Sequence, residues 1–142
     1  MKKKKILVLC TGNSCRSQMA EGWFRELRED EFDVWSAGIE SHGLNPRAVK
    51  VMAEAGVDIS SHHSKLTDEL KDIDFDMVIT VCDSARENCP YFPGKVKRYH
   101  KSFDDPPGIT KEWTDEEAIL DVYRRVRDEI KYFTETFKPS NV

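Results

Sequence analysis

The chain has 142 residues, of which 39% are hydrophobic and 34% are charged, and its formal net charge is −4. These values are typical of one globular domain over 1–142, with an ordered core at about 5–137, and they argue against a disordered chain. The acidic balance favours no nucleic-acid partner, so any affinity for anions must come from a local site. No apolar stretch is long enough to span a membrane or to serve as a signal peptide. We therefore expect a cytoplasmic protein, most simply a monomer, that binds neither membranes nor nucleic acid.

Strands and helices are expected to alternate along the chain. Runs of apolar or alternating residues predict strands at 5–9, 32–37, 76–81 and 95–99. Apolar residues at helical spacing predict one helix over about 17–29, and a short helix is expected at about 65–71.

Capping residues mark two further helices. Asn45 and Pro46 have the residue types of an N-cap and a first helical position, and Gly56 is a suitable stop. Thr114 is expected to cap the last helix, with Glu117 completing a capping box. An apolar face then continues for five turns of that helix, through Ile119, Val122, Tyr123, Val126, Ile130 and Phe133.

This order predicts an α/β fold: a single-domain, open, parallel four-stranded sheet with helices on both faces. Ligands of such sheets bind at the carboxyl ends of the strands. Cys10 and Cys82 each follow a predicted buried strand directly. If those strands are neighbours, both sulfurs lie at the same edge of the sheet.

Residues 10–17, between the first strand and the first helix, are the candidate oxyanion loop. Consecutive backbone N–H groups and a helix N-terminus can surround a tetrahedral oxyanion, and Arg16 can bind two of its oxygens. Gly12 and Asn13 tolerate the left-handed backbone that such a loop requires. The same donors should lower the pKa of Cys10 well below about 8.5. The predicted substrate-binding residues are Thr11, Gly12, Asn13, Ser14, Cys15, Arg16 and Ser17.

Within this loop, Thr11 and Ser17 offer hydroxyl donors, whereas Cys15 is interpreted as a small buried apolar residue. The alternative for the whole segment is a structural cysteine after a strand, with Arg16 capping a local group.

The loop sequence, Cys-x₅-Arg-Ser, resembles the nucleophilic loop of the low-molecular-weight protein tyrosine phosphatase fold. The chain is more similar to one branch of that fold, the thioredoxin-coupled arsenate reductases. The similarity covers nearly all of 5–137, and its most similar stretches are 10–22, 36–38, 45–46, 103–106 and 125–130.

The turn-rich stretch at 104–108 contains the candidate proton donor. On sequence alone it could be a plain turn. In the enzymes that it resembles, the aspartate directly before proline is the general acid, which selects Asp105 over Asp104. Pro107 and Gly108 stand where tyrosine phosphatases of this fold have aromatic residues. This difference predicts a shallow mouth that suits a small inorganic anion better than phosphotyrosine.

The resemblance also implies a thiol relay, in which Cys10 attacks arsenate and Cys82 and then Cys89 resolve the intermediate. Thioredoxin would be the external reductant, no cofactor would be bound, and phosphate or sulfate could occupy the loop in place of arsenate. Residues seven apart on a helix are separated by about 10 Å, so 83–89 would have to unwind to join Cys82 and Cys89.

Three alternatives remain at this point. Cys82 and Cys89 could be core cysteines with no relay. The protein could be a phosphatase for small phosphoesters that uses Cys10, Arg16 and Asp105, or a non-catalytic oxyanion or redox sensor.

No metal site is expected, because the cysteines and histidines lack the spacings of zinc ligands. Some members of the resembling branch bind potassium through residues that match Asn13, Glu21, Ser36 and an aspartate at position 65. This chain has Lys65 there, so we expect no potassium site and an ion pair between Lys65 and Glu21, the alternative being an exposed lysine. No chemistry is assigned to the histidines, His42, His62, His63 and His100, although His62 could hold the nearby loop.

Overall fold

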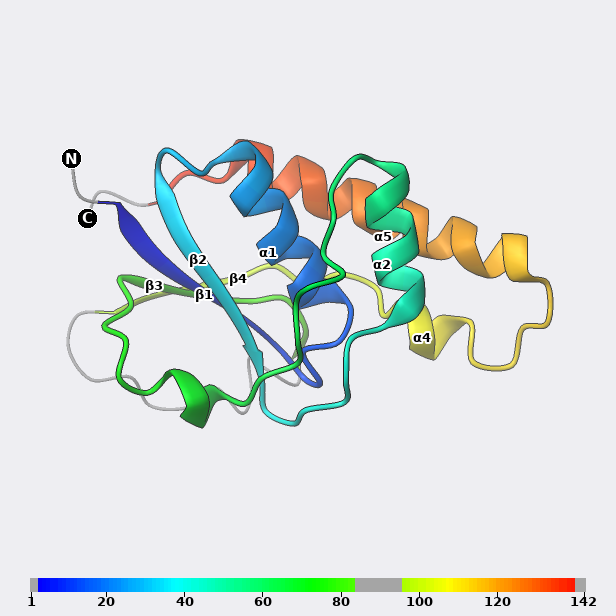
Figure 1. Ribbon diagram of the computed structural model, residues 1–142, viewed down its shortest axis with the longest axis horizontal. Helices are drawn as coiled ribbons and strands as arrows, with labels where there is room; N and C mark the ends of the chain where they lie inside the picture. The colour runs from blue at the N-terminus through cyan, green and yellow to red at the C-terminus, as the bar shows by residue number, and fades with distance from the viewer. Residues whose placement is uncertain (1–2, 84–95, 140–142) are drawn as a thin grey trace.

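The computed structural model describes residues 3–83 and 96–139, so the predicted relay residue Cys89 lies outside the described residues. The described chain forms one four-stranded sheet with the strand order β2-β1-β3-β4, and every pairing in it is parallel (Figure 1). The strands are β1 (Lys4–Cys10), β2 (Phe32–Gly38), β3 (Met77–Thr80) and β4 (Lys97–His100). The predicted parallel four-stranded sheet is therefore confirmed.

The winding of the chain changes direction between β1 and β3, which are neighbours in the sheet. In open α/β sheets, this switch point is where ligands bind, beyond the carboxyl ends of the two strands. Cys10 is the last residue of β1, and Cys82 lies two residues after the end of β3. The two cysteines therefore lie at the same sheet edge, as expected.

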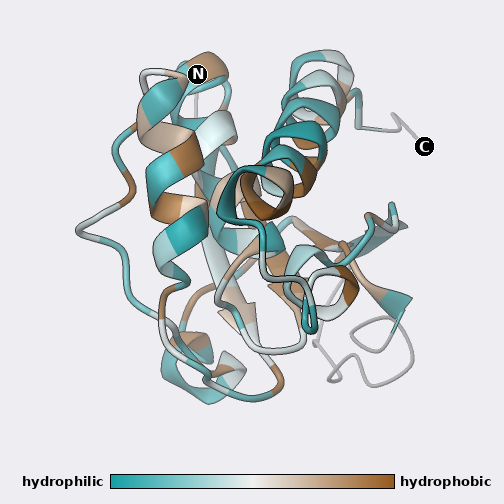
Figure 2. Cartoon of the chain, turned by 90° about the vertical axis from the view of Figure 1, so that its right-hand side faces the viewer, coloured by the Kyte–Doolittle hydropathy of each residue, from teal (hydrophilic) through white to brown (hydrophobic). Residues whose placement is uncertain are grey.

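Three helices form a layer on one face of the sheet: α1 (Arg16–Leu27), α2 (Pro46–Glu54) and α5 (Glu116–Thr136) (Figure 1). Helix α1 packs on β1 and β2, and α2 and α5 pack against α1 and against each other. The hydrophobic side of α5 faces the rest of the molecule and its outer side is hydrophilic (Figure 2). On the other face of the sheet, Phe75 packs edge-on against Trp35, near the 3-10 helix η1 (Thr67–Leu70). The short helix predicted at 65–71 is thus a single 3-10 turn.

The core lies between the sheet and the helical layer. Ile6, Leu7, Val8 and Leu9 of β1 are fully buried because β1 is a central strand that is covered on both faces. Phe24, Phe32 and Phe137 join α1, β2 and the end of α5 by edge-to-face or tilted ring contacts. Arg28 donates to the carbonyls of Thr134 and Phe137 and thereby caps the last turn of α5.

The predicted helix starts were correct in one case and wrong in the other. The Asn45 side chain accepts hydrogen bonds from the backbone N–H groups of Arg47 and Ala48, so Asn45 is the N-cap of α2. The predicted Thr114 cap of the last helix is wrong. Asp115 is the N-cap of α5, and its carboxylate accepts from the backbone N–H of Glu117. The extra helix α4 (Pro106–Ile109) occupies a stretch predicted as a turn.

None of the helices within 3–83 and 96–139 has the length and apolar composition needed to cross a membrane.

Candidate active site

The oxyanion loop, residues 10–17, joins the end of β1 to the first turn of α1. Asn13 has a φ angle of 48°, the left-handed conformation expected for it. Gly12 does not adopt this conformation, which corrects the prediction for that residue. Glycine is required there for another reason, since a Cβ atom would overlap the His42 ring. The loop backbone is also tied to the segment after β2, through Glu40 N–H to the Thr11 carbonyl at 2.8 Å.

A buried hydrogen-bond network holds the loop from behind. The fully buried Asn13 side chain donates to Ser17 Oγ at 2.8 Å and accepts from the Lys65 backbone N–H at 2.8 Å. The fully buried Gln18 donates through Nε2 to the Asn13 side-chain oxygen at 3.1 Å and to the His63 carbonyl at 3.0 Å. Sequence reasoning missed Gln18, and the only indication was a polar side chain directly after the loop at the start of an otherwise apolar helix face.

Glu21 anchors a second polar cluster next to this network. Its carboxylate is buried and accepts from Ser36 Oγ at 2.6 Å, and it pairs with Arg25 at 3.1 Å and with the Lys65 ammonium at 3.9 Å. The expected pairing of Lys65 with Glu21 is therefore present. Burial lowers the pKa of Lys65 from its ordinary value, and the Glu21 charge opposes that shift. His62 contacts Gln18 Oε1 through Nδ1 at 3.0 Å, so it also borders the loop network.

Arg16 and Asp105 face each other at the front of the loop. Arg16 donates to the Phe103 carbonyl at 3.0 Å, and its other terminal nitrogen lies 3.7 Å from Asp105 Oδ1. A Cβ atom on Gly108 would lie 2.7 Å from Asp105 Oδ2, so the absence of a side chain there leaves room for the carboxylate. The structure thus brings the predicted proton donor to the predicted oxyanion-binding arginine.

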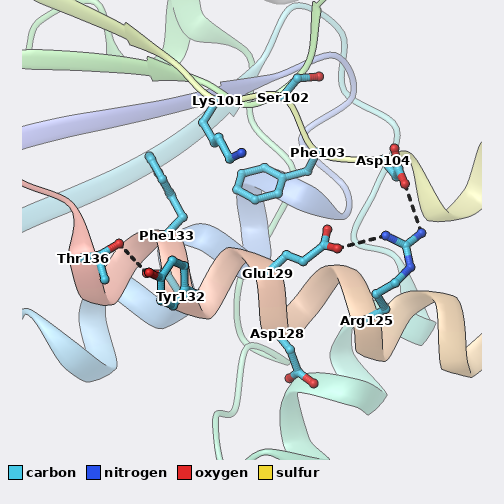
Figure 3. Close-up of a pocket in the computed structure, with 10 residues that line it drawn as sticks. All are labelled: Lys101, Ser102, Phe103, Asp104, Arg125, Asp128, Glu129, Tyr132, Phe133 and Thr136. Carbon is cyan, nitrogen blue, oxygen red and sulfur yellow. Dashed lines mark hydrogen bonds and ion pairs between the residues drawn. The ribbon is translucent and has the colours of Figure 1, made fainter.

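Asp104 points away from the loop and toward α5. Arg125 donates to Asp104 at 3.1 Å and to Glu129 at 3.1 Å (Figure 3). These residues line an open groove of about 890 Å³ between 101–104 and α5. The groove includes no residue of the oxyanion loop, so the candidate site is located by its converging hydrogen-bond donors and not by this groove.

The thiols of Cys10 and Cys82 are both buried and close enough to affect each other's protonation. The Thr11 hydroxyl lies 3.3 Å from Cys82 Sγ. The hydrogen bond with Cys82 and burial raise the pKa of Cys10, and they outweigh the lowering effect of Arg16. This direction is opposite to the sequence prediction, because the prediction did not include a second thiol that shares the proton. Burial also raises the pKa of Cys15 to about 12, in line with its interpretation as a buried apolar residue.

Within 3–83 and 96–139, no group of three or more histidine, cysteine or acidic residues is arranged to hold a metal ion.

The chain as a whole is similar to known proteins. The model of the low molecular weight phosphotyrosine protein phosphatase family matches residues 5–138. The chain belongs to this family. A protein of Staphylococcus epidermidis named arsenate reductase 2 is 50% identical over 138 residues, which are 97% of this chain and 98% of that protein.

Solved structures of this family give the same fold. An arsenate reductase in the phosphate-binding state is 32% identical, has a TM-score of 0.71, and covers 93% of this chain and 94% of its own. A low molecular weight protein tyrosine phosphatase from T. tengcongensis is 26% identical, has a TM-score of 0.72, and covers 94% of this chain and 96% of its own. The phosphatase-like fold expected from the sequence is therefore confirmed.

Proposed function

We propose that the protein reduces arsenate to arsenite through a relay of three thiols, Cys10, Cys82 and Cys89, as a step in arsenic detoxification. The observation that carries this proposal is the proximity of two buried thiols, Cys10 and Cys82, at the oxyanion loop. Phosphate-ester hydrolysis through a cysteine needs one thiol, whereas reduction needs a second thiol within reach of the first. The relatives named arsenate reductases, one of them solved with phosphate bound, support the same reading.

In the first step, the Cys10 thiolate attacks the arsenic of arsenate held in the loop. The backbone N–H groups of residues 11–17 and the Arg16 guanidinium offset the oxyanion charge. One oxygen leaves as water after Asp105 donates a proton, and a Cys10–arsenic(V) bond forms. The ion pair between Arg16 and Asp105, at 3.7 Å, supports this division of roles because both groups face the same space.

In the second step, the Cys82 thiolate attacks the sulfur of Cys10. The electron pair of the sulfur–arsenic bond moves to arsenic, which is reduced from As(V) to As(III) and leaves as arsenite. A Cys10–Cys82 disulfide remains. The contact of the Thr11 hydroxyl with Cys82 Sγ supports this role, because a hydroxyl that donates to sulfur stabilises the thiolate.

In the third step, the Cys89 thiolate attacks Cys82 and releases Cys10 as a thiolate. An external dithiol then reduces the Cys82–Cys89 disulfide. Thioredoxin, with a potential of about −270 mV, is a suitable donor in a reducing cytoplasm, where we place the protein as a monomer without a bound cofactor. Cys89 lies outside the described residues, so its part rests on the sequence resemblance.

A weak phosphatase activity is expected from the same loop, because phosphate and arsenate have the same shape and charge. It would use Cys10, Arg16 and Asp105 and would not need Cys82 or Cys89. Solved phosphatases of this fold, such as the one from T. tengcongensis, support this side activity.

The test measures arsenite production from arsenate with thioredoxin, thioredoxin reductase and NADPH. The unmodified protein should turn over continuously, and Cys89→Ser should stop after about one equivalent because its disulfide cannot move to Cys89. Hydrolysis of an aryl phosphate by Cys89→Ser serves as the control and should be unchanged. Hydrolysis without any arsenate-dependent NADPH use would refute the reductase and favour the phosphatase.

A further inference from the structure

The His100 side chain contacts residues that lie before and after Cys82 in the sequence. The Thr80 hydroxyl lies 2.7 Å from His100 Nδ1, and His100 Nε2 lies 3.1 Å from Asp83 Oδ1. Thr80 is buried, whereas about a quarter of the His100 side chain is exposed (24%). The imidazole therefore connects the residue two positions before Cys82 to the residue directly after it.

The sheet places the His100 ring beside Thr80, on the face opposite α5. Tyr99 points to α5, where its ring contacts Phe137, so alternation along β4 turns His100 to the opposite face. Thr80 is the register partner of His100, and Cys82 follows Thr80 by two residues. The contact of Cys82 Sγ with Thr11 lies at this sheet edge as well.

Backbone hydrogen bonds continue past the end of β3. Lys101 N–H donates to the Thr80 carbonyl at 2.9 Å and Phe103 N–H donates to the Val81 carbonyl at 3.2 Å. The His100 ring extends this support to Asp83, which is one residue beyond Cys82. A neutral ring can satisfy both contacts. Because a carboxylate only accepts, Nε2–H donates to Asp83, and Nδ1 accepts from the Thr80 hydroxyl.

We propose that His100 is a positioning residue for Cys82, a role that rests on the relay proposed above. Attack of one sulfur on another needs a narrow range of distances and angles. The ring holds the residues on both sides of Cys82 and so fixes the direction from which its sulfur approaches Cys10. His100 acts through its contacts with Thr80 and Asp83 and takes no part in the chemistry itself.

The experiment measures a single turnover of arsenate in the Cys89→Ser background, where the Cys10–Cys82 disulfide accumulates. Adding His100→Ala should slow arsenite release about tenfold, because small displacements of a reacting group cost this much or more. Aryl phosphate hydrolysis, which uses Cys10 but not Cys82, should stay within about twofold of the parent. Asp83→Ala should reproduce the loss and Asp83→Asn, which keeps an oxygen acceptor, should restore most of the rate.

His63→Ala is the matched control, because it removes another exposed imidazole but keeps the backbone carbonyl that contacts Gln18 and Lys65. An unchanged single-turnover rate in His100→Ala, or equal losses of arsenite release and aryl phosphate hydrolysis, would overturn the proposal.

A second measurement separates this proposal from the reductase itself. The thiol oxidant diamide converts Cys10 and Cys82 to a disulfide without arsenate, and peptide mapping gives the rate. If the protein produced no arsenite at all, the proposed function would fail. Slower disulfide formation in His100→Ala would still support the positioning role, and an unchanged rate would refute it.

Discussion

The oxyanion loop and the acid segment, residues 103–108, face each other across the candidate site but are held in different ways. The loop rests on Asn13 and Gln18, whose side chains are fully buried and hydrogen-bonded. The acid segment is tied to α5 by an ion pair of Asp104 with Arg125, whose side chains are 60% and 46% exposed. Buried hydrogen bonds are costly to break, whereas exposed ion pairs contribute little. The loop is therefore preformed, whereas the Asp105 side chain, which is 51% exposed and 3.7 Å from Arg16, is held less tightly.

The largest expected effect comes from removing the proton donor itself. Asp105→Asn should lower kcat for both arsenate reduction and aryl phosphate hydrolysis by about 10²–10⁴-fold, since it can no longer donate a proton to the leaving oxygen. Asp104→Asn is the matched control, because Asp104 faces Arg125 and not the loop. Steady-state kinetics of both variants check this, and similar losses in the two would mean that charge near the loop matters more than proton transfer.

The sequence predicted the loop because its chemistry is local. Cysteine, left-handed backbone, arginine and helix start all fall within residues 10–17, between elements whose apolar patterns are clear. The N-cap of the last helix was wrongly predicted at Thr114, because Asp115 beside it is also a strong capping residue. Sequence alone does not decide between two such neighbours. The N-cap at Asn45 was predicted correctly because neither residue beside it is a common capping residue.

The parts that sequence reasoning missed depend on partners that are distant along the chain. Gln18 joins Asn13 to the His63 carbonyl, and the pKa of Cys10 depends on a hydrogen bond with Cys82. Periodicity places each of these residues on an element, but it does not say which side chains meet. The direction of the pKa shift of Cys10 therefore could not be predicted before the position of the strand that precedes Cys82 was known.

The second largest effect tests whether the loop is preformed. Gln18→Leu keeps the volume but leaves buried polar groups of Asn13 and His62 without this partner, which should lower the free energy of unfolding by about 1–3 kcal/mol. Phosphate affinity should fall as well. Glu26→Ala, on the exposed side of the same helix, is the control and should change stability by less than about 0.5 kcal/mol. Denaturant unfolding and phosphate titration measure both, and a stable Gln18→Leu protein with normal affinity would contradict a rigid loop.

Proton sharing at the loop gives a pH prediction. A raised pKa keeps Cys10 as a thiol to higher pH, so its alkylation by iodoacetamide should accelerate only as the pH rises. Cys82→Ala removes the hydrogen bond that contributes most to this shift, and its alkylation profile should move to lower pH. Alkylation rates at Cys10 across a pH series, followed by mass spectrometry, check the direction. A profile that does not move, or moves to higher pH, would mean that burial and not Cys82 controls the thiol.

Lys65 allows a test of the cluster behind the loop. With its ammonium 3.9 Å from the buried Glu21 carboxylate, added potassium should change neither stability nor turnover of the unmodified protein. Lys65→Asp replaces the internal cation with a second carboxylate, which oxygen-binding cations favour, and it should make both quantities depend on potassium. Lys65→Met is the control that removes the charge without adding oxygen ligands. Thermal unfolding and kcat in potassium and in a large organic cation measure the difference.

The smallest expected effect concerns the tether of the acid segment. Arg125→Ala breaks the links to Asp104 and Glu129, but exposed ion pairs contribute under about 1 kcal/mol, so kcat should fall by at most about fivefold. Arg124→Ala is matched to it, because Arg124 pairs with Glu54, Glu117 and Asp121 and does not contact the acid segment. It should leave kcat unchanged. If Arg125→Ala instead approached the loss of Asp105→Asn, the proton donor would be as rigidly held as the loop, and the contrast between the two regions would disappear.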